Sequence, residues 1–130
     1  NKGPTVVLVK ANDCIFGGYT DQHWELGCGY KPCNSPFLFS LRNKDNLAPF
    51  IANIKQGQKV HAIRCHWRYG PIFGGGHDLC ISNNPQARTS GSFFGETYQL
   101  PPGYVCGSEE ASNLLAGQSH FLTTEIEVFN

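Results

Sequence analysis

The spacing of apolar and polar residues predicts a chain built mainly of β-strands. Two β-rich runs, 5–11 and 14–20, lie on either side of an Asn-Asp pair that suits a turn. The Gly17-Gly18 pair inside the second run suggests a bulge or a close packing contact. Further strands are expected at 36–41, 59–67, 77–82 and 120–129, the last with apolar residues at 122, 126 and 128.

Two segments carry the signals of short helices. Residues 46–57 have Asn46 as a cap, Pro49 in the first turn and Gly57 as a stop. Residues 108–117 begin with Ser108, which can cap the helix, and continue with two glutamates that suit its positive end. Several strands with two short helices predict a mainly β fold, a two-sheet β-sandwich in which residues 1–130 form one domain.

Composition narrows the classes of partner. Ten basic side chains balance ten acidic ones, and 40% of the 130 residues are hydrophobic. A nucleic-acid-binding protein would normally carry a basic excess, so we expect no nucleic-acid partner. The chain has no apolar run of about 18 residues, so we expect no membrane insertion.

The cysteine content favours an oxidising location. The chain has six cysteines and no methionine, even at position 1, which favours removal of a secretory leader and a secreted protein with disulfides. Cys28 and Cys33 lie in one Gly- and Pro-containing loop and are expected to pair. The remaining four allow three pairings, among which Cys65 with Cys80 is attractive; the others are Cys14 and Cys106. Free thiols are the alternative. The spacings do not fit zinc, so we expect no metal.

The glycine-rich stretch YGPIFGGGHDLCISNN (69–84) looks chemical but lacks the spacing of a known site. Its contiguous glycines match neither the dinucleotide fingerprint nor the P-loop, and a strand is expected after them. His77 and Asp78 would point to opposite faces of that strand, so they cannot form a dyad. We expect Asp78 to accept hydrogen bonds from backbone amides in the turn. No poised nucleophile is recognisable, so an enzyme is not expected.

Several segments together resemble the TLDc domain family: GPTVVLVK, IFGGYTDQHWE, FLFSL, YGPIFGGGHDLCIS, YQLPPGY, LLAGQSHF and EIEVF. Their order and spacing match from residue 3 to 129. The resemblance implies a two-sheet β-sandwich with short helices, no cofactor and no established catalytic residues. Intracellular members are linked to oxidation resistance and to binding the V-type proton pump. The motif positions, expected to define the fold, are Phe16, Gly17, Gly18, Trp24, Gly70, Phe73, Gly74, Gly75, Asp78, Gly117 and Glu125.

A secreted β-sandwich without catalytic groups is expected to bind a ligand, and we expect a carbohydrate. Sugar sites combine aromatic faces with planar polar side chains that reach hydroxyl groups. Two clusters around Trp24 and Trp67, with an asparagine pair near the second, supply such groups: Asp21, His23, Glu25, His66, Trp67, Arg68, Tyr69, Asn83 and Asn84. Packing of Trp24 in the core and a turn at the asparagines before Pro85 are the plainer interpretations.

The expected function is therefore that of a lectin that recognises cell-surface or microbial glycans in innate immunity. Single sugar sites are weak, so we expect a homo-oligomer that gains avidity. One alternative is an intracellular domain that contributes oxidation resistance, or proton-pump binding, through a protein partner. A hydrolase acting on glycans is a third hypothesis.

Overall fold

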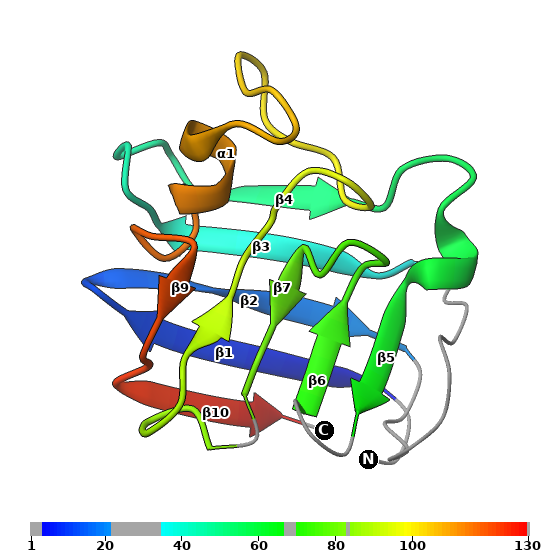
Figure 1. The fold of residues 1–130 in the computed structure, drawn as a ribbon. Coiled ribbons are helices and arrows are strands. Elements are labelled where there is room, and N and C mark those ends of the chain that lie inside the picture. The colour runs from blue at the N-terminus through cyan, green and yellow to red at the C-terminus, as the bar shows by residue number, and fades with distance from the viewer. Residues whose placement is uncertain (1–3, 22–34, 67–69, 83, 130) are drawn as a thin grey trace.

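The computed structural model describes residues 4–21, 35–66, 70–82 and 84–129, which form two packed antiparallel sheets of five strands each (Figure 1). Sheet A has the order β10-β1-β2-β3-β4 and sheet B the order β5-β6-β7-β8-β9. The predicted mainly β, two-sheet architecture is confirmed. The strands are β1 Thr5–Ala11, β2 Cys14–Thr20, β3 Phe37–Arg42, β4 Phe50–Asn53, β5 Ile63–His66, β6 Gly70–Phe73, β7 Leu79–Cys80, β8 Ser90–Gly91, β9 His120–Phe121 and β10 Glu125–Phe129.

The first hairpin agrees with the sequence prediction at both strands. Asn12 and Asp13 join β1 to β2 with φ angles of 51° and 65°, a left-handed conformation that Asn and Asp tolerate better than most residues. Inward side chains of β1 are buried, whereas the alternate ones face outward and are half-buried. Sheet A therefore has an inner face toward sheet B and an outer face away from it.

The Gly17-Gly18 pair permits two close approaches. A Cβ at Gly18 would lie 2.5 Å from the Phe73 ring, which β6 of sheet B places there. A Cβ at Gly17 would lie 2.8 Å from the Phe39 ring and closer still to the backbone of Val7. The β2–β3 register also shifts between Ile15 and Phe16. Of the two alternatives predicted for this pair, close packing is confirmed, whereas the irregularity of the ladder lies before the pair, between Ile15 and Phe16.

The helix predicted for 46–57 is wrong, because this segment contains strand β4. Asn46 has a φ of 57° and does not cap a helix. Pro49 precedes the strand, where it blocks no ladder hydrogen bond, and Phe50–Asn53 pair with β3. Pairing with β3 and burial of Ala52 outweigh the local helix signals.

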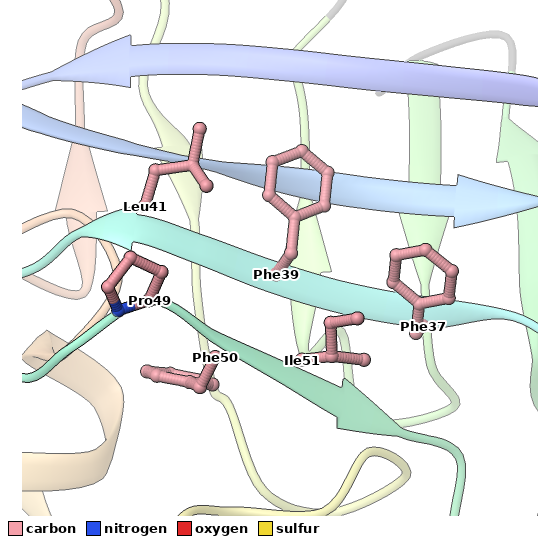
Figure 2. A pocket seen from close by; sticks show the side chains of 6 residues that line it. All are labelled: Phe37, Phe39, Leu41, Pro49, Phe50 and Ile51. Atoms are coloured by element: carbon pink, nitrogen blue, oxygen red, sulfur yellow. The ribbon is translucent and has the colours of Figure 1, made fainter.

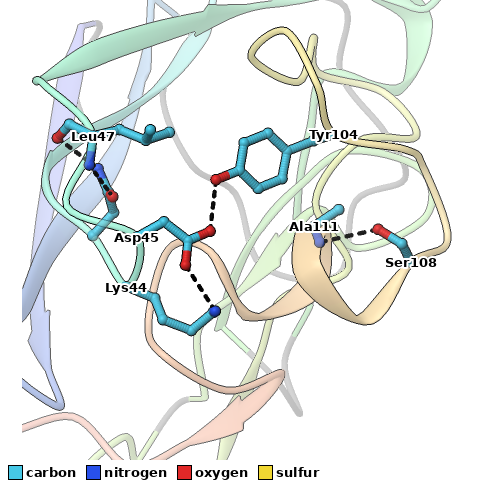
Figure 3. A network of polar contacts seen from close by, with 7 residues as sticks. Lys44, Asp45, Leu47, Tyr104, Ser108 and Ala111 are labelled. Carbon is cyan, nitrogen blue, oxygen red and sulfur yellow. Dashed lines mark hydrogen bonds and ion pairs between the residues drawn. The ribbon is translucent and has the colours of Figure 1, made fainter.

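The second predicted helix exists but is shorter than expected. Helix α1 spans Glu109–Asn113, and the Ser108 hydroxyl accepts a hydrogen bond from the Ala111 amide at 3.1 Å (Figure 3). The predicted cap is therefore confirmed. Nearby, the Asp45 carboxylate accepts hydrogen bonds from Lys44 and from the Tyr104 hydroxyl, at 2.8 and 2.6 Å. The second bond raises the Tyr104 pKa to about 12.

Three predicted strands differ from the structure. The 120–129 segment divides between the two sheets, as β9 in sheet B and β10 in sheet A. Of the three apolar positions in this segment, Leu122 and Val128 are exposed, whereas Ile126 packs against the core. The 59–67 segment begins with a 3₁₀ turn over Lys59–His61 before β5, and only Leu79–Cys80 of 77–82 form a strand.

The buried Asp78 carboxylate explains why a glycine is needed at position 74 of the glycine-rich stretch. Its fully buried carboxylate accepts hydrogen bonds from the amides of Gly95, Thr97 and Tyr98 at 2.9 to 3.1 Å. A Cβ at Gly74, whose φ is 93°, would lie 2.3 Å from this carboxylate. Asp78 therefore accepts from backbone amides as predicted, but they belong to the 95–98 segment rather than to its own turn. Burial raises the pKa of Asp78, and the amide hydrogen bonds partly oppose that shift.

Candidate functional site

The structure describes only part of the predicted sugar-binding set. His23, Glu25, Trp67, Arg68, Tyr69 and Asn83 lie outside the described residues, as does Trp24, and only the backbone of His66 is described, in β5. Asp21 follows β2 in sheet A, whereas Asn84 follows β7 in sheet B. The two described members thus leave different sheets, and their joint role in a sugar site stays a prediction.

Asn84 has a structural role in a turn. Its amide donates to the Ser82 hydroxyl at 3.1 Å. Its carbonyl accepts hydrogen bonds from the amides of Ala87 and Arg88 at 3.1 and 2.8 Å. These contacts agree with the plainer interpretation of the asparagine pair, namely a turn before Pro85.

The cysteine pairings proposed for the described residues do not occur. Cys14, Cys80 and Cys106 are free thiols, and Cys28 and Cys33 lie outside the described residues. Cys65 pairs with Pro71 of β6, and Ile72 of β6 pairs with Cys80. Because β6 separates them, the backbones of Cys65 and Cys80 are two strand spacings apart, roughly 9–10 Å, beyond the reach of a disulfide.

A polar pocket lies where the β1–β2 hairpin meets the end of β3. It encloses about 430 Å³ and is lined by Lys10, Asn12, Asp13, Cys14, Ile15, Arg42 and Thr124. Within the described parts of the chain, the Asp13 carboxylate and the Arg42 guanidinium have no hydrogen bond or ion pair. One free anion and one free cation therefore border a cavity whose size suits a small polar ligand.

Backbone contacts hold this polar pocket in place. The Asn12 side-chain amide donates to the Ala116 carbonyl at 2.9 Å, which fixes the hairpin tip to the chain beyond α1. The amide and hydroxyl of Thr124 both donate to the Lys10 carbonyl, at 2.8 and 3.0 Å. Arg42 reaches the pocket because the register shift in β2–β3 pairs it with the outward residue Ile15.

Cys14 is one of the residues that line the polar pocket. Burial raises the pKa of its thiol, the nearby Asp13 charge raises it further, and Arg42 acts in the opposite direction. A thiol with a raised pKa is mostly protonated near neutral pH and is a weak nucleophile. The pocket can therefore bind a ligand through its charges, while Cys14 does not suit covalent chemistry.

An apolar groove runs along β3 and β4 on the outer face of sheet A. It encloses about 520 Å³ and is lined by Phe37, Phe39, Leu41, Pro49, Phe50 and Ile51. Figure 2 shows these side chains along the two neighbouring strands. Leu41 is 51% exposed and Ile51 is 58% exposed. The groove shares no lining residue with the polar pocket.

The apolar groove continues into a second cavity at the start of β3. This cavity, of about 650 Å³, is lined by Tyr19, Ser35, Pro36, Phe37, Ile51, Asn53, Ile54 and Lys59. The rings of Tyr19 and Phe37 stack with centroids 5.0 Å apart. An aromatic row thus extends from the apolar groove toward an amide and an ammonium group.

The described residues contain no cluster of three or more His, Cys, Asp or Glu side chains arranged to hold a metal ion. None of their helices has the length and apolar character needed to cross a bilayer.

A comparison with protein families then settles the relationship of the chain. The family model described as TLDc domain matches residues 1–130, the whole length. The chain belongs to the TLDc family. A search of curated proteins finds no match.

The described TLDc motif residues have structural surroundings. Phe16, Phe73 and Asp78 are fully buried, and Gly18 lies against the Phe73 ring. Glu125 is exposed and its carboxylate lies 3.4 Å from the Lys10 ammonium. These positions agree with the expectation that the TLDc motif defines the fold.

The polar pocket and the apolar groove were both missed by sequence reasoning. The pocket joins residues 10–15 with Arg42 and Thr124, which no local pattern connects. The groove did leave a signal, because one alternating set of the strand at Phe37–Arg42 is entirely apolar (37, 39 and 41) and the other set includes the apolar Leu38. Such a strand is expected to be covered on both faces, yet here the outer face of the TLDc sheet is partly exposed.

Proposed function

We propose that this TLDc protein is a non-catalytic binding protein whose ligand is a carbohydrate, bound in the polar pocket. The observation that carries the proposal is the unpaired pair of charges, Asp13 and Arg42, on a hairpin held by backbone contacts. Carboxylate and guanidinium groups are the planar partners that sugar hydroxyls use, and charged partners strengthen those hydrogen bonds. The apolar wall at Ile15 suits the C–H surface of a sugar ring.

A glycan array with the native protein tests this proposal. Arg42→Ala removes the unpaired guanidinium, and Arg88→Ala is the matched control because Arg88 is exposed in the 84–88 turn, outside the lining of the pocket. We expect binding to a defined terminal sugar that weakens about tenfold or more in Arg42→Ala, since a charged hydrogen bond is worth about 1.5–3 kcal/mol. Arg88→Ala should bind like the native protein.

Two other results would count against the proposal. An array without signal at high protein concentration would reject a carbohydrate ligand. Equal binding by Arg42→Ala and the native protein would reject the polar pocket as the site and return attention to the predicted loop residues Asp21, His23 and Glu25.

The alternative function is TLDc-type binding of a protein partner, with a role in oxidation resistance or at the V-type proton pump. The exposed apolar groove favours it, because large apolar patches on soluble proteins commonly mark interaction sites. Purified proton-pump cytosolic sector that binds the native chain, but not Ile51→Glu, would support this alternative. The same experiment with no binding, beside a positive glycan array, would reject it.

We place the proposed lectin outside the cell. The support is the predicted Cys28–Cys33 bridge. Cys14, Cys80 and Cys106 are free thiols and give no support for an oxidising location. Intact mass of the natural protein, before and after reduction and alkylation, would reveal that bridge. Recovery of six alkylated cysteines without reduction would contradict it and favour the intracellular alternative.

A further inference from the structure

The outer face of sheet A is apolar far beyond the groove on β3 and β4. Its outward positions carry half-buried or exposed apolar side chains on all five strands: Val6, Leu8, Ile15, Tyr19, Phe37, Phe39, Leu41, Ile51 and Phe129. Single exposed apolar residues need no explanation, but a contiguous patch does. We call this set the outer apolar face.

The shape of the outer apolar face suits a second sheet. The Phe39 ring lies over Gly17 in the middle strand, where a side chain would otherwise project. In Figure 2 the six lining side chains spread along two strands rather than surrounding a deep hole. A helix about 10 Å wide would cover roughly two strands, spaced at about 4.8 Å, and leave the rest exposed. A sheet packed at about 10 Å covers all five.

The area of the face reaches what a specific dimer needs. Five strands at about 4.8 Å, each with about six residues at about 3.3 Å, give roughly 24 by 20 Å, or about 500 Å² in flat projection. A two-fold contact buries the same patch on both copies, so the total buried area is about 1,000 Å². This figure leaves out the additional area of side chains that project from the flat face. Specific interfaces begin at about 1,000–1,200 Å².

The distribution of charge favours a second copy. The formal net charge is +0, so two chains do not repel each other at long range. Lys10 and Glu125 form an ion pair at the β1–β10 side, and Arg42 lies at one end of β3. These charges, with the exposed Glu127 opposite Leu8, lie on the β10 side of the face or at one end of β3, whereas Phe39 and Ile51 lie in its apolar part on β3 and β4. Apolar patches bordered by polar groups are typical of protein interfaces.

We propose that the outer apolar face is the contact surface of a homodimer, in which sheet A of one copy packs face to face on sheet A of another. Its most apolar part consists of Phe37, Phe39, Leu41 and Ile51 on β3 and β4. The polar pocket shares none of the groove's lining residues, but Ile15 belongs both to the pocket lining and to the outer apolar face, so the dimer would cover that wall of the pocket. The dimer itself does not depend on the carbohydrate proposal, since it concerns the free protein.

Sedimentation velocity across about 1–100 μM, without ligand, tests the dimer. We expect twice the mass of one chain at high concentration and a weaker dimer in Leu41→Glu and Ile51→Glu. A charge in the apolar part of the interface should raise the dimer Kd by about 30-fold or more. Both residues are more than half exposed, so the variants should fold, which circular dichroism and urea titration would verify.

Leu122→Glu is the matched control. Leu122 is 49% exposed, close to the values for Leu41 and Ile51. It follows β9 of sheet B and lies outside the outer apolar face. It should dimerise like the native chain. A native chain that stays monomeric at the highest concentration would overturn the proposal, and so would a dimer that only Leu122→Glu disrupts. Neither result affects the glycan array, so the two proposals fail independently.

Discussion

The Asp78 carboxylate is buried beside the glycine-rich turn, and its partners are backbone amides. Its Oδ2 accepts from Gly95, Thr97 and Tyr98, whereas Oδ1 accepts only from Thr97. One oxygen therefore carries most of the contacts. The same arrangement gives the acid of the His-Asp pair a structural role beside the three glycines, because it accepts hydrogen bonds from the 95–98 backbone.

Two replacements of Asp78 should distinguish the contribution of its hydrogen-bond acceptor from the contribution of its negative charge to stability. Asp78→Ala leaves three buried amides without an acceptor, so we expect a loss of about 3 kcal/mol or more in the free energy of unfolding. Asp78→Asn can place one amide oxygen at the Oδ2 position and should lose only about 1 kcal/mol, the difference between a charged and a neutral acceptor.

Urea titration measures both values, with Asp45→Ala as an exposed control. The control should change stability by less than about 1 kcal/mol, since its bonds to Lys44 and Tyr104 are at the surface. Equal losses for Asp78→Ala and Asp78→Asn would contradict the role assigned to Oδ2.

A helix or strand of this TLDc domain has the conformation that its local sequence predicts where its pairing with other strands favours the same conformation. The β1–β2 hairpin and the Ser108 cap were predictable because their signals lie within a few residues. The β4 segment was not, because pairing with β3 overrides an Asn, Pro and Gly pattern that suits a helix equally well. The two ends of 120–129 lie in different sheets, which no alternation within the segment can reveal.

The contact between β2 and β6 can be tested at Gly18. A Cβ there would lie 2.5 Å from the Phe73 ring, which is itself fully buried between the sheets. We expect Gly18→Ala to lower the free energy of unfolding by about 1–3 kcal/mol through overpacking. Gly91→Ala in β8 is the control, because its Cβ would find no atom closer than 3.7 Å. A Gly91→Ala variant as unstable as Gly18→Ala would argue for a backbone effect instead.

On the scale of the whole molecule, the candidate sites were less predictable than the fold. The polar pocket joins the hairpin, the end of β3 and the crossover before β10, three segments that only the tertiary structure brings together. Arg42 lines the pocket because of a register shift between β2 and β3, and no residue in the sequence predicts that shift. By contrast, the series of TLDc segments spans nearly the whole chain, so the family was recognisable before any geometry was known.

The three described thiols should differ sharply in reactivity. Cys106 is exposed, whereas burial raises the pKa of Cys14 and raises that of Cys80 to about 11. Since the thiolate is the reactive form, iodoacetamide at about pH 8 should label Cys106 at least tenfold faster than Cys80. Raising the pH toward the Cys80 value should narrow the gap, and unfolding in urea should remove it.

Peptide mapping by mass spectrometry follows each thiol separately. Labelling of Cys80 as fast as that of Cys106 in the native protein would show that β7 opens readily or that Cys80 is not buried as described.

The pairing of β1 with β10 links the first and the last strand of the described domain. Val6 lies opposite Phe129, so sheet A lacks one edge strand until nearly the whole domain has been synthesised. Until then the TVVLV run of β1 presents an unpaired, β-prone edge, the kind of segment that promotes aggregation. Sheet A can therefore reach its final strand order only after β10 has been synthesised. Until then the growing chain needs another way to keep β1 from aggregating, a need that ends once the domain has folded.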